Sequence, residues 1–355
     1  MSAAPRIVIA AGGTAGHVVP ALAVADALRA EGAAVSFIGG ERAEAQLVPQ
    51  AGYTLQTLTL EGLSRSNPLR ALRAVVLALL ATGRARRLLK AMRPDAVMGG
   101  GGYVAGPVCL AALSLRLPIV LTEADSHLGL TNRLLAPLAK RVCLAFPLPG
   151  RSGRRYLVTG RPIPAAAPAR EPARAAFKVA DGDTLVLVFG GSLGARSINR
   201  AAIEAFTGAP FSVLHVCGRR DYPELARTAL PARYDLREYL ELEDFAQALA
   251  AADLVVARAG GSVFEILANG LPSVLVPYPH AAADHQSANA RWLADAGAAV
   301  VIADGDLNGG RLGGEVAALL ADPHRLHEMA GAARSLARPQ AAREIAKELL
   351  RAAAA

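Results

Sequence analysis

The sequence has few cysteines and no long apolar run, and each shortage excludes a class of protein. Its three cysteines (Cys109, Cys143 and Cys217) lie far apart, which excludes a disulfide-stapled scaffold and a CxxC zinc site and suits a reducing compartment. The longest apolar stretches span about 8 residues, whereas a membrane-spanning helix needs roughly 18–20. The opening MSAAPRIVIAAGG lacks the basic-then-apolar order of a signal peptide. We therefore expect a cytoplasmic protein without a membrane span.

Aromatic residues are also scarce, at 5% of the chain, and they do not alternate with basic residues as in proteins that stack nucleic-acid bases. Hydrophobic residues make up 53% and charged residues 19%, which excludes a disordered chain. The charge is uneven, because residues 1–163 hold 19 Lys and Arg against 8 Asp and Glu, whereas residues 164–355 hold 19 against 22. A basic first half favours an anionic partner such as nucleic acid, phosphate groups or an anionic membrane surface. Frequent arginine in an Ala-rich sequence is the alternative explanation.

Short apolar runs alternate with helical patterns along the whole chain. This pattern is typical of parallel strands buried on both faces and separated by helices, in doubly wound α/β sheets that bind ligands at the carboxyl ends of their strands. We expect strands at residues 6–11, 34–38, 96–98, 119–122 and 142–144, then at 184–189, 211–217, 254–257, 273–276 and 299–302, and in the first half helices at 20–31, 68–92, 104–114 and 129–139.

The chain contains a proline-rich stretch at residues 161–176, which is typical of a linker between domains. Each half opens alike, with a strand, a Gly-rich turn and a helix. We therefore expect two Rossmann-like doubly wound α/β domains that face each other across a cleft. Their expected bounds are 1–163 and 164–339, with a helix at 340–355 packing back across the domains.

The first Gly-rich turn, Gly12–His17, follows a strand and precedes a helix. Its glycines allow backbone amides to approach a ligand, and the helix N-terminus favours negative charge. It lacks the GxGxxG spacing and the later acidic residue of a dinucleotide site, and a plain strand–helix turn is the alternative. A histidine at this position is able to act as a general base near neutral pH, so His17 is a candidate catalytic residue.

Three further turns lie in the second half. Gly190–Arg196 repeats the strand–turn–helix context, and a plain turn is again the alternative. In Arg258–Glu265, the carboxylate of Glu265 is suited to accept both hydroxyls of a ribose, or it forms a capping box with Ser262. Near a helix start within His280–Asn289, three polar side chains suited to sugar hydroxyls gather: Asp284, Gln286 and Asn289.

The sequence offers little to bind a metal. His280 and His285 do not have the HExxH spacing of a zinc site. The two DxD triplets, Asp181–Asp183 and Asp304–Asp306, both read DGD and flank strands, so we interpret them as turns. We therefore predict no metal and no cofactor, with basic groups and helix dipoles stabilising a leaving diphosphate.

Six stretches together resemble the GT-B glycosyltransferases and, more narrowly, the MurG-type N-acetylglucosaminyltransferases. The resemblance covers nearly the whole chain in order. The stretches are GGTAGHVVPALAVADAL from Gly12, GGYVAGP at Gly101–Pro107, GLTNRLLA at Gly129–Ala136, GGSLGAR from Gly190, RAGGSVFE from Arg258 and DHQSANA at Asp284–Ala290.

The resemblance implies a role for each matching residue. Thr14, Ala15 and Gly16 would contact the donor sugar and diphosphate, with His17 at the reaction centre. Ser192 would bind donor phosphate, Leu242 would present its backbone to uracil, and Glu265 would hold the ribose, so that His17 and Glu265 are the expected catalytic residues. Gln286 would recognise the N-acetylglucosamine hydroxyls, and the GGYVAGP turn would face the acceptor diphosphate.

The sequence departs from the family pattern at three of these positions. The family's GGTGGH reads GGTAGH, which places a methyl group at Ala15. Its EQN reads Glu123-Ala124-Asp125, so a carboxylate at Asp125 replaces a donor-binding amide. Its GNPVR lacks the terminal arginine here, and Arg161, three residues earlier, is a candidate to supply the charge.

The implied reaction is an inverting transfer of N-acetylglucosamine from UDP-N-acetylglucosamine to the 4-hydroxyl of an undecaprenyl-diphosphate-linked muramyl pentapeptide. The enzyme alternatives are a GT-B transferase for another acceptor, such as a soluble natural product, and a UDP-N-acetylglucosamine 2-epimerase. The non-enzyme alternative is a basic nucleic-acid-binding protein, which the low aromatic content disfavours.

Residues 63–92 form a segment whose composition predicts contact with a membrane surface. It has no acidic residue, and its apolar centre at Ala74–Ala81 is flanked by cations, which suits an interfacial surface on an anionic leaflet. A buried helix with its arginines extended to solvent is the alternative. We expect the first domain to dock peripherally on the cytoplasmic face of the membrane through the basic residues Arg65, Arg70, Arg73, Arg84, Arg86, Arg87 and Lys90.

Overall fold

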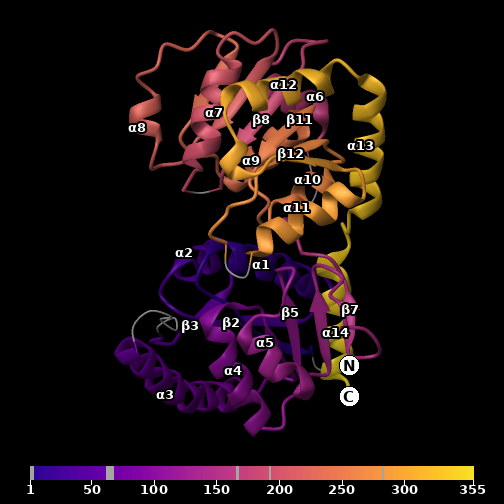
Figure 1. Cartoon of the computed structure of the whole chain (residues 1–355). Helices are drawn as coiled ribbons and strands as arrows, with labels where there is room; N and C mark the ends of the chain where they lie inside the picture. Colours follow the sequence, from indigo (N-terminus) through magenta and orange to yellow (C-terminus); the bar gives the residue numbers. More distant parts are fainter. Residues whose placement is uncertain (1–3, 61–67, 165–167, 192, 282–283) are drawn as a thin grey trace. The chain divides into compact units, whose positions relative to one another are not determined.

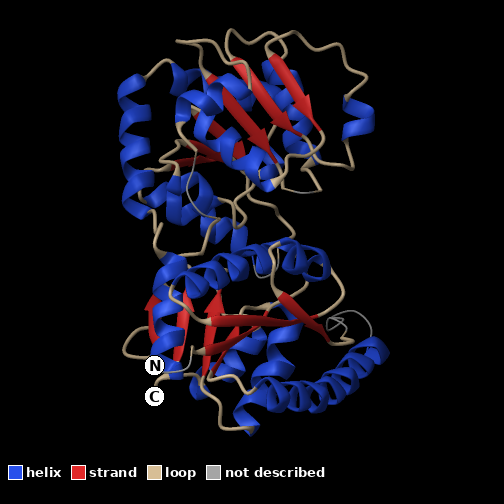
Figure 2. Ribbon diagram, turned by 180° about the vertical axis from the view of Figure 1, so that it is seen from behind, coloured by secondary structure: helices blue, strands red, loops and turns tan. Residues whose placement is uncertain are grey.

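The chain folds into two compact α/β units, each built around one sheet (Figures 1 and 2). The computed structural model describes residues 4–60, 68–164, 168–191, 193–281 and 284–355, and within residues 68–75 only the backbone. Unit 1 is Met1–Ala165 together with Arg338–Ala355, and unit 2 is Ala166–Ala337.

Unit 1 has a seven-stranded sheet in the order β3-β2-β1-β4-β5-β6-β7, with the described strands paired in parallel. Its elements are β1 (Arg6–Ala10), α1 (Ala15–Ala30), β2 (Ala34–Gly39), α2 (Ala43–Gln50), β3 (Thr54–Thr57), α3 (Pro68–Met92), β4 (Ala96–Gly99), α4 (Gly102–Ser114), β5 (Ile119–Glu123), α5 (Leu130–Leu135), η1 (Ala136–Leu138), β6 (Arg141–Leu144), β7 (Tyr156–Val158) and α14 (Ala341–Ala353).

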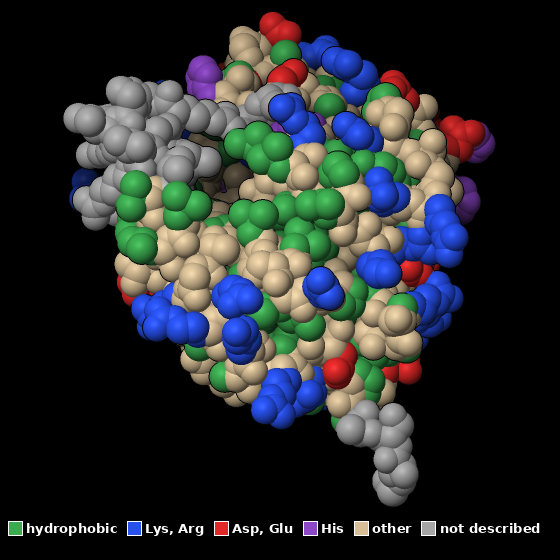
Figure 3. Space-filling view, turned by 90° about the horizontal axis from the view of Figure 1, so that it is seen from below, with side chains coloured by type: hydrophobic (Ala, Val, Ile, Leu, Met, Phe, Trp, Pro, Cys, Tyr) green, Lys and Arg blue, Asp and Glu red, His purple; other side chains and the backbone are tan. Residues whose placement is uncertain are grey.

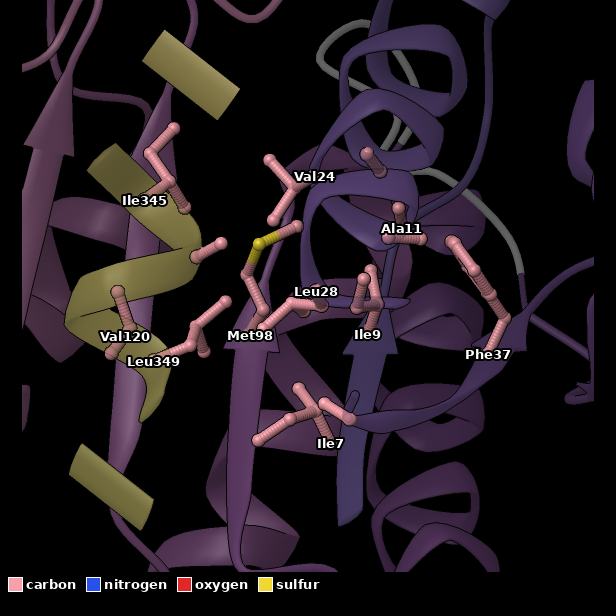
Figure 4. Close-up of a cluster of buried hydrophobic side chains, with 14 of the residues drawn as sticks. Ile7, Ile9, Ala11, Val24, Leu28, Phe37, Met98, Val120, Ile345 and Leu349 are labelled. Carbon is pink, nitrogen blue, oxygen red and sulfur yellow. The ribbon is translucent and has the colours of Figure 1, made fainter. Parts of the chain in front are cut away.

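Both faces of this sheet are buried at its centre, which explains why the central strands β1, β4 and β5 are mostly apolar rather than alternating. Successive side chains of a strand point to opposite faces. From β1, Ile7 and Ile9 join one cluster with Val24 and Leu28 of α1 and with α14 (Figure 4), whereas Val8 and Ala10 join a second cluster with α3 and α4. The sheet therefore holds a hydrophobic core on each side.

Unit 2 has a six-stranded parallel sheet in the order β10-β9-β8-β11-β12-β13. Its elements are α6 (Arg170–Ala176), β8 (Leu185–Phe189), α7 (Arg196–Phe206), β9 (Ser212–Val216), α8 (Tyr222–Leu225), β10 (Tyr234–Arg237), α9 (Leu242–Ala251), β11 (Leu254–Ala257), α10 (Val263–Ala268), β12 (Ser273–Leu275), α11 (His285–Asp295), β13 (Ala299–Val301), η3 (Asp304–Asp306), α12 (Gly309–Leu320) and α13 (Pro323–Leu336).

The prediction of two Rossmann-like doubly wound α/β domains is confirmed, but some elements differ from expectation. Helix α1 begins at Ala15, five residues before the expected start. Residues 170–176, assigned by the sequence to the linker, form helix α6. The sequence analysis also missed helix α2 and the three short strands β3, β7 and β10.

The C-terminal segment forms the expected helix, α14, which packs on unit 1. Ile345 and Leu349 are buried in the cluster that contains β1 and α1 (Figure 4). On the same helix Glu348 is 5% exposed, and one of its oxygens lies 2.6 Å from Nε of Arg141 on β6. The final helix is thus part of the core of unit 1.

Candidate active site

The two Gly-rich turns follow the strands, β1 and β8, at which each sheet reverses its order. Strand β1 pairs with both β2 and β4, and β8 pairs with both β9 and β11. In doubly wound sheets, ligands bind beyond the carboxyl ends of the strands at such a switch point. The two Gly-rich turns, Gly12–His17 and Gly190–Arg196, start at these two positions.

The first turn brings His17 to the exposed start of helix α1. Gly13 has a φ of +108°, which side-chain-bearing residues rarely adopt. In the described part of the chain Thr14, the N-cap residue, makes no side-chain cap bond, and its hydroxyl instead lies 3.3 Å from Nδ1 of His17. Because the helix starts at Ala15, the amides of Ala15 and Gly16 have no intrahelical acceptor.

Arg161 binds the same turn through a carbonyl group left open by a proline. Pro20 lies inside α1 and lacks the N–H group that would bond the Gly16 carbonyl four residues earlier. One guanidinium nitrogen of Arg161 donates to that carbonyl at 2.5 Å. A cation is therefore fixed at the start of α1, three residues before the position of the family's arginine.

The surroundings of His17 favour its neutral form. Burial lowers the pKa of the imidazole below its ordinary value of 6.5, and the positive charge of Arg161 lowers the pKa further. The carboxylates of Asp125 and Glu44 act in the opposite direction but do not outweigh burial. His17, Arg161 and Glu123 line one pocket in unit 1.

The GGYVAGP segment, expected as a turn, forms the N-cap and first turns of helix α4, and its two leading glycines lie against the first Gly-rich turn. Gly101 and Gly102 both have positive φ, and a Cβ atom at Gly101 would lie 2.7 Å from Cδ2 of His17. A Cβ atom at Gly102 would lie 2.0 Å from the Gly12 carbonyl oxygen, so any side chain here would collide with backbone. The glycines let the two turns pack directly on one another.

Asp125 lies in a loop that the buried Glu123 holds in place. The Glu123 carboxylate accepts hydrogen bonds from the Gly129 amide at 2.8 Å, the Asn132 side chain at 2.9 Å and the Asp125 amide at 3.2 Å. Burial nonetheless raises the pKa of Glu123 above its ordinary value. Thr14, Ala15 and Gly16 thus precede His17 in the first turn, Arg161 binds that turn, and the charge of Asp125 acts on the imidazole.

In unit 2, the second Gly-rich turn packs on the loop after β9. Ser192 lies outside the described residues. A Cβ atom at Gly194 would lie 1.9 Å from the Cys217 carbonyl oxygen. Asn199 of α7 donates to that same carbonyl and to Asp221, and its side-chain oxygen lies 3.0 Å from Nε2 of His215. Burial lowers the pKa of His215 to about 4, so this imidazole is neutral and donates from Nε2 to Asn199.

Leu242 and Glu265 both lie at helix starts in unit 2. Leu242 is the first residue of α9 and is 43% exposed. Glu265 is in the first turn of α10 and is half-buried. Within the described residues, Ser262 makes no side-chain cap bond, so the capping box that was the alternative role of Glu265 is not formed.

Gln286 lies beside the turn that precedes α10. Its side-chain oxygen accepts a hydrogen bond from the Tyr278 amide at 3.0 Å, which leaves its NH₂ group to donate. Three residues later, Asn289 donates to the Ala259 carbonyl at 2.9 Å. Arg258 donates to the carbonyls of residues 276 and 277 and to Asp304. These bonds join the turns after β11 and β12 into one surface.

The two DGD triplets are turns, as predicted, with Asp304–Asp306 forming the 3₁₀ helix η3. The Asp304 carboxylate accepts hydrogen bonds from Arg258 and from Ser197, both at 2.6 Å. Its hydrogen-bond partners are therefore other side chains of unit 2. Among the residues that the structure describes, no group of three His, Cys, Asp or Glu side chains is arranged to hold a metal.

Sequence reasoning missed the residues that hold these turns in place. Glu44 binds the first Gly-rich turn from helix α2, which was not predicted. Glu123, Asn132 and Arg258 lie inside the quoted motifs, but spacing alone does not assign them partners. Asn289, expected beside sugar hydroxyls, is instead 1% exposed and donates to the Ala259 carbonyl. A buried polar residue beside a glycine turn is the signal that points to such a role.

The chain matches known proteins over nearly its whole length. Residues 7–144 match the glycosyltransferase family 28 N-terminal domain, and residues 185–349 match the glycosyltransferase family 28 C-terminal domain. The chain is 45% identical over 365 residues to the UDP-N-acetylglucosamine--N-acetylmuramyl-(pentapeptide) pyrophosphoryl-undecaprenol N-acetylglucosamine transferase of Moorella thermoacetica, with 98% of each chain covered.

Solved structures agree with this match. The crystal structure of Acinetobacter baumannii MurG has a TM-score of 0.78 and 33% identity to this chain, and the alignment covers 98% of this chain and 99% of that one. A UDP-N-acetylglucosamine 2-epimerase has a TM-score of 0.67 at 16% identity, covering 99% of this chain and 96% of that one. The second likeness shows a common fold alone.

Proposed function

Because this chain belongs to glycosyltransferase family 28, we propose that it transfers N-acetylglucosamine from UDP-N-acetylglucosamine to the 4-hydroxyl of an undecaprenyl-diphosphate-linked muramyl pentapeptide. The name of the relative from Moorella thermoacetica describes this reaction, and that relative matches 98% of the chain. The observation that carries the proposal is the neutral His17 at the start of α1, among the glycine turns of unit 1.

In the proposed reaction His17 is the general base. Its imidazole takes the proton from the acceptor's 4-hydroxyl while that oxygen forms a bond to the anomeric carbon of the donor sugar. The bond from that carbon to the UDP oxygen breaks on the opposite face, so the anomeric configuration inverts and UDP leaves. A base of this kind contributes on the order of 10²–10⁴-fold to the rate.

The groups of unit 1 around His17 stabilise the charge that develops. We assign the amides of Ala15 and Gly16 and the hydroxyl of Thr14 to the donor sugar and diphosphate, because a helix N-terminus favours an anion. Arg161 adds a full positive charge at the same helix start. Asp125 is assigned to a donor hydroxyl, and the turn at Gly101–Pro107 to the acceptor diphosphate.

The nucleotide of the donor is assigned to unit 2. Leu242 presents its backbone amide at the start of α9 to uracil, and the Glu265 carboxylate accepts the ribose hydroxyls. The NH₂ group of Gln286 donates to a hydroxyl of the N-acetylglucosamine. Ser192, which lies outside the described residues, is assigned to a donor phosphate from its place in the GGSLGAR turn.

Unit 1 also presents an apolar surface ringed by cations (Figure 3). Within the described ranges, no helix is both long and apolar enough to cross a bilayer. Exposed Arg84, Arg86, Arg87 and Lys90 of α3 flank the surface. Arg65 lies outside the described residues, as do the side chains of Arg70 and Arg73. The large exposed apolar residues on the adjoining helices α3, α4, α5 and η1 are Val76, Leu79, Leu80, Leu110, Leu130, Leu134 and Leu138.

This surface supports peripheral docking on an anionic membrane at its cytoplasmic face. Leu79 is 68% exposed and Leu134 is 66% exposed, whereas a helix packed wholly in the core would bury such side chains. Apolar residues surrounded by lysine and arginine suit the boundary between acyl chains and anionic headgroups. Docking there would bring unit 1 to a lipid-linked acceptor.

Ligand protection tests the donor assignment. A ligand that binds only the folded state raises the melting temperature by an amount set by its concentration and affinity. We expect UDP-N-acetylglucosamine to stabilise the protein more than UDP-glucose, UDP-N-acetylgalactosamine or TDP-glucose. If it stabilises no more than the other three, the donor assignment is wrong.

Two variants test which residues recognise the sugar and the nucleotide of the donor. Gln286→Ala is expected to reduce the difference between the stabilisation by UDP-N-acetylglucosamine and that by UDP-N-acetylgalactosamine. The stabilisation by UDP itself should not change. Glu265→Ala is expected to weaken all uridine nucleotides together. Transfer of radiolabelled sugar to a muramyl pentapeptide on a lipid diphosphate then tests the acceptor, with the unphosphorylated lipid analogue as the control.

A further inference from the structure

Glu44, on the second residue of helix α2, has a buried carboxylate that is bound on both oxygens. Oε2 accepts a hydrogen bond from the Gly13 amide at 2.8 Å, and Oε1 accepts one from the Gly40 amide at 2.8 Å. The hydroxyl of Tyr103, from α4, lies 3.4 Å from Oε1. The residue is 0% exposed. One carboxylate thus bonds to groups from the turns after β1, β2 and β4.

The glycines around this carboxylate show how closely it is packed. A Cβ atom at Gly12 would lie 2.5 Å from Oε1 of Glu44, and one at Gly39 would lie 2.9 Å from its Cγ. A Cβ atom at Gly40 would lie 2.8 Å from the same oxygen. At all three positions a side chain would collide with the Glu44 side chain, as well as with Val104, Leu55 or Tyr103.

A buried charge is costly unless it is hydrogen-bonded, and the amides of Gly13 and Gly40 meet this need for Glu44. The hydrogen bond from Gly13 to Glu44 also decides which backbone amides of the first turn are left to bind a ligand. The Gly13 amide is taken by the protein, while the amides of Ala15 and Gly16, which follow directly, have no intrahelical acceptor. Glu44 thus limits which amides of the turn are available to an anionic ligand.

We propose that Glu44 is a positioning residue for sugar transfer, which holds the Gly12–Gly13 turn so that His17 and the Ala15 and Gly16 amides face the substrates. The proposal rests on the function proposed above. Glu44 is not one of the residues assigned to the substrates above, because it acts on the reaction centre only by holding the turn that it binds.

The charge of Glu44 has a second effect that a purely structural residue would not have. Facing His17 are the carboxylates of Asp125 and Glu44, which raise its pKa, and the guanidinium of Arg161, which lowers it, while Glu123 lines the same pocket. Neutralising Glu44 therefore removes one group that favours the protonated imidazole. The pKa of His17 falls, and the acidic limb of the kcat/KM profile moves to lower pH.

The test compares Glu44→Gln with wild-type protein. A glutamine keeps one acceptor oxygen, but its NH₂ group meets the other backbone N–H, so one of the two amide bonds is lost. We expect kcat to fall roughly 10- to 100-fold, since a small misplacement of reacting groups has effects of this size. The affinity for uridine, which lacks the diphosphate, is expected to stay within about twofold, because the contacts assigned to uracil and ribose are in unit 2. Glu41→Gln, at an exposed position three residues earlier, is the matched control.

Gly40→Ala tests the same carboxylate from another turn. Gly40 has no positive φ, so the backbone accepts alanine, but the new methyl group displaces Glu44 and the Tyr103 hydroxyl, 2.4 Å from its position. It should reproduce the loss of kcat. Gly208→Ala, where a Cβ atom meets nothing within 4 Å, is its control. Hydrogen exchange should show faster exchange at Gly13 and Gly40 in Glu44→Gln.

Three outcomes overturn the proposal. Wild-type kcat in Glu44→Gln, with an unshifted pH profile, removes the role of Glu44 alone. Loss of uridine affinity and of melting temperature together with kcat, in both variants, would mean a general loss of folding. Wild-type protein that binds UDP-N-acetylglucosamine but transfers no sugar would refute the proposed function itself, and the wild-type arm identifies that case separately.

Discussion

A histidine serves as a general base only while its imidazole is neutral, and the environment of His17 keeps it so. Burial is the largest cause of its lowered pKa, and Arg161 adds to it. The same arginine depends on Pro20, because an ordinary residue there would donate its own amide to the Gly16 carbonyl. One proline within α1 thus links the charge at the helix start to the protonation of His17.

The kinetics of His17 variants follow from this chemistry. His17→Ala is expected to reduce transfer by roughly 10²–10⁴-fold while leaving UDP-N-acetylglucosamine binding largely intact, because a base acts on the rate rather than on ground-state binding. Steady-state kinetics and calorimetric titration of the donor measure the two effects. Near wild-type turnover would mean that His17 only forms part of the turn.

Two variants should shift the acidic limb of the kcat/KM profile in opposite directions. The folded pKa lies below 6.5, so kcat/KM should be constant above that pH and fall below it as the base is protonated. Arg161→Gln removes a charge that disfavours protonation, so the acidic limb should move to higher pH. Asp125→Asn should move it to lower pH, and Arg161→Lys, which keeps the charge, should move it least. Shifts of the same sign in the first two variants would contradict the assignment of the base to His17.

Some site residues are visible in the sequence and others are not, for a physical reason. Gly13 and Gly101 are marked because a positive φ excludes most other residues at those turns. Glu44 is not marked, because its bond to Gly13 joins residues 31 apart through the fold. The roles assigned to Leu242, Glu265 and Gln286 come from a family resemblance, and they stay predictions until a ligand or variant tests them.

At the level of elements, the sequence predicted the central strands and missed the edge strands. Strands such as β8, with five buried residues in LVLVF, are apolar because both faces are covered. The strands β3, β7 and β10 end a sheet and carry exposed or polar residues, as in TLQT of β3, so their composition resembles that of loops. Edge strands are therefore defined by pairing with a neighbour, which a pattern along the chain does not contain.

Helix α14 depends on one buried ion pair as well as on its apolar face. The side chain of Glu348 is 6% exposed and pairs with Arg141 on β6 and with Arg351. Glu348→Ala leaves the buried end of Arg141 without its partner, so we expect the free energy of unfolding to fall by about 1–3 kcal/mol. Urea unfolding measures this, with the exposed Lys347→Ala on the same helix as the control. Equal stability of both variants would show that the apolar face alone holds the helix.

At the scale of the whole molecule, the uneven charge has a location in the fold. The first half of the chain, with 19 basic and 8 acidic residues, builds the sheet and helices α1 to α5 of unit 1. Four of these cations, Arg84, Arg86, Arg87 and Lys90, are exposed on α3, and Figure 3 shows Lys and Arg side chains beside the apolar patch on this face. Sequence alone left open whether α3 is a buried helix, and the burial of Ala85 and Leu89 beside the exposure of Leu79 and Leu80 shows that it is buried along one side only.

Membrane docking by this surface is testable by co-sedimentation of the whole chain with vesicles. Each lysine or arginine near an anionic surface adds about 1 kcal/mol of attraction, and salt weakens it. We expect binding to anionic vesicles at low salt, weaker binding at high salt, and little binding to zwitterionic vesicles. Reversing Arg84, Arg86 and Arg87 to glutamate should reduce binding, whereas the same charge change at Arg200, Arg227 and Lys347 should reduce it less.

The contribution of the apolar residues to vesicle binding can be measured separately from that of the cations. Leu79→Ser with Leu80→Ser should weaken binding at high salt as well as low, because burial of apolar area in the headgroup boundary is not screened. Both side chains are about two-thirds exposed, at 68% and 67%, so the double variant should keep its melting temperature. Equal binding to both kinds of vesicle would mean that the cations take no part in docking. Absence of binding to either kind would mean that unit 1 meets its acceptor by another route.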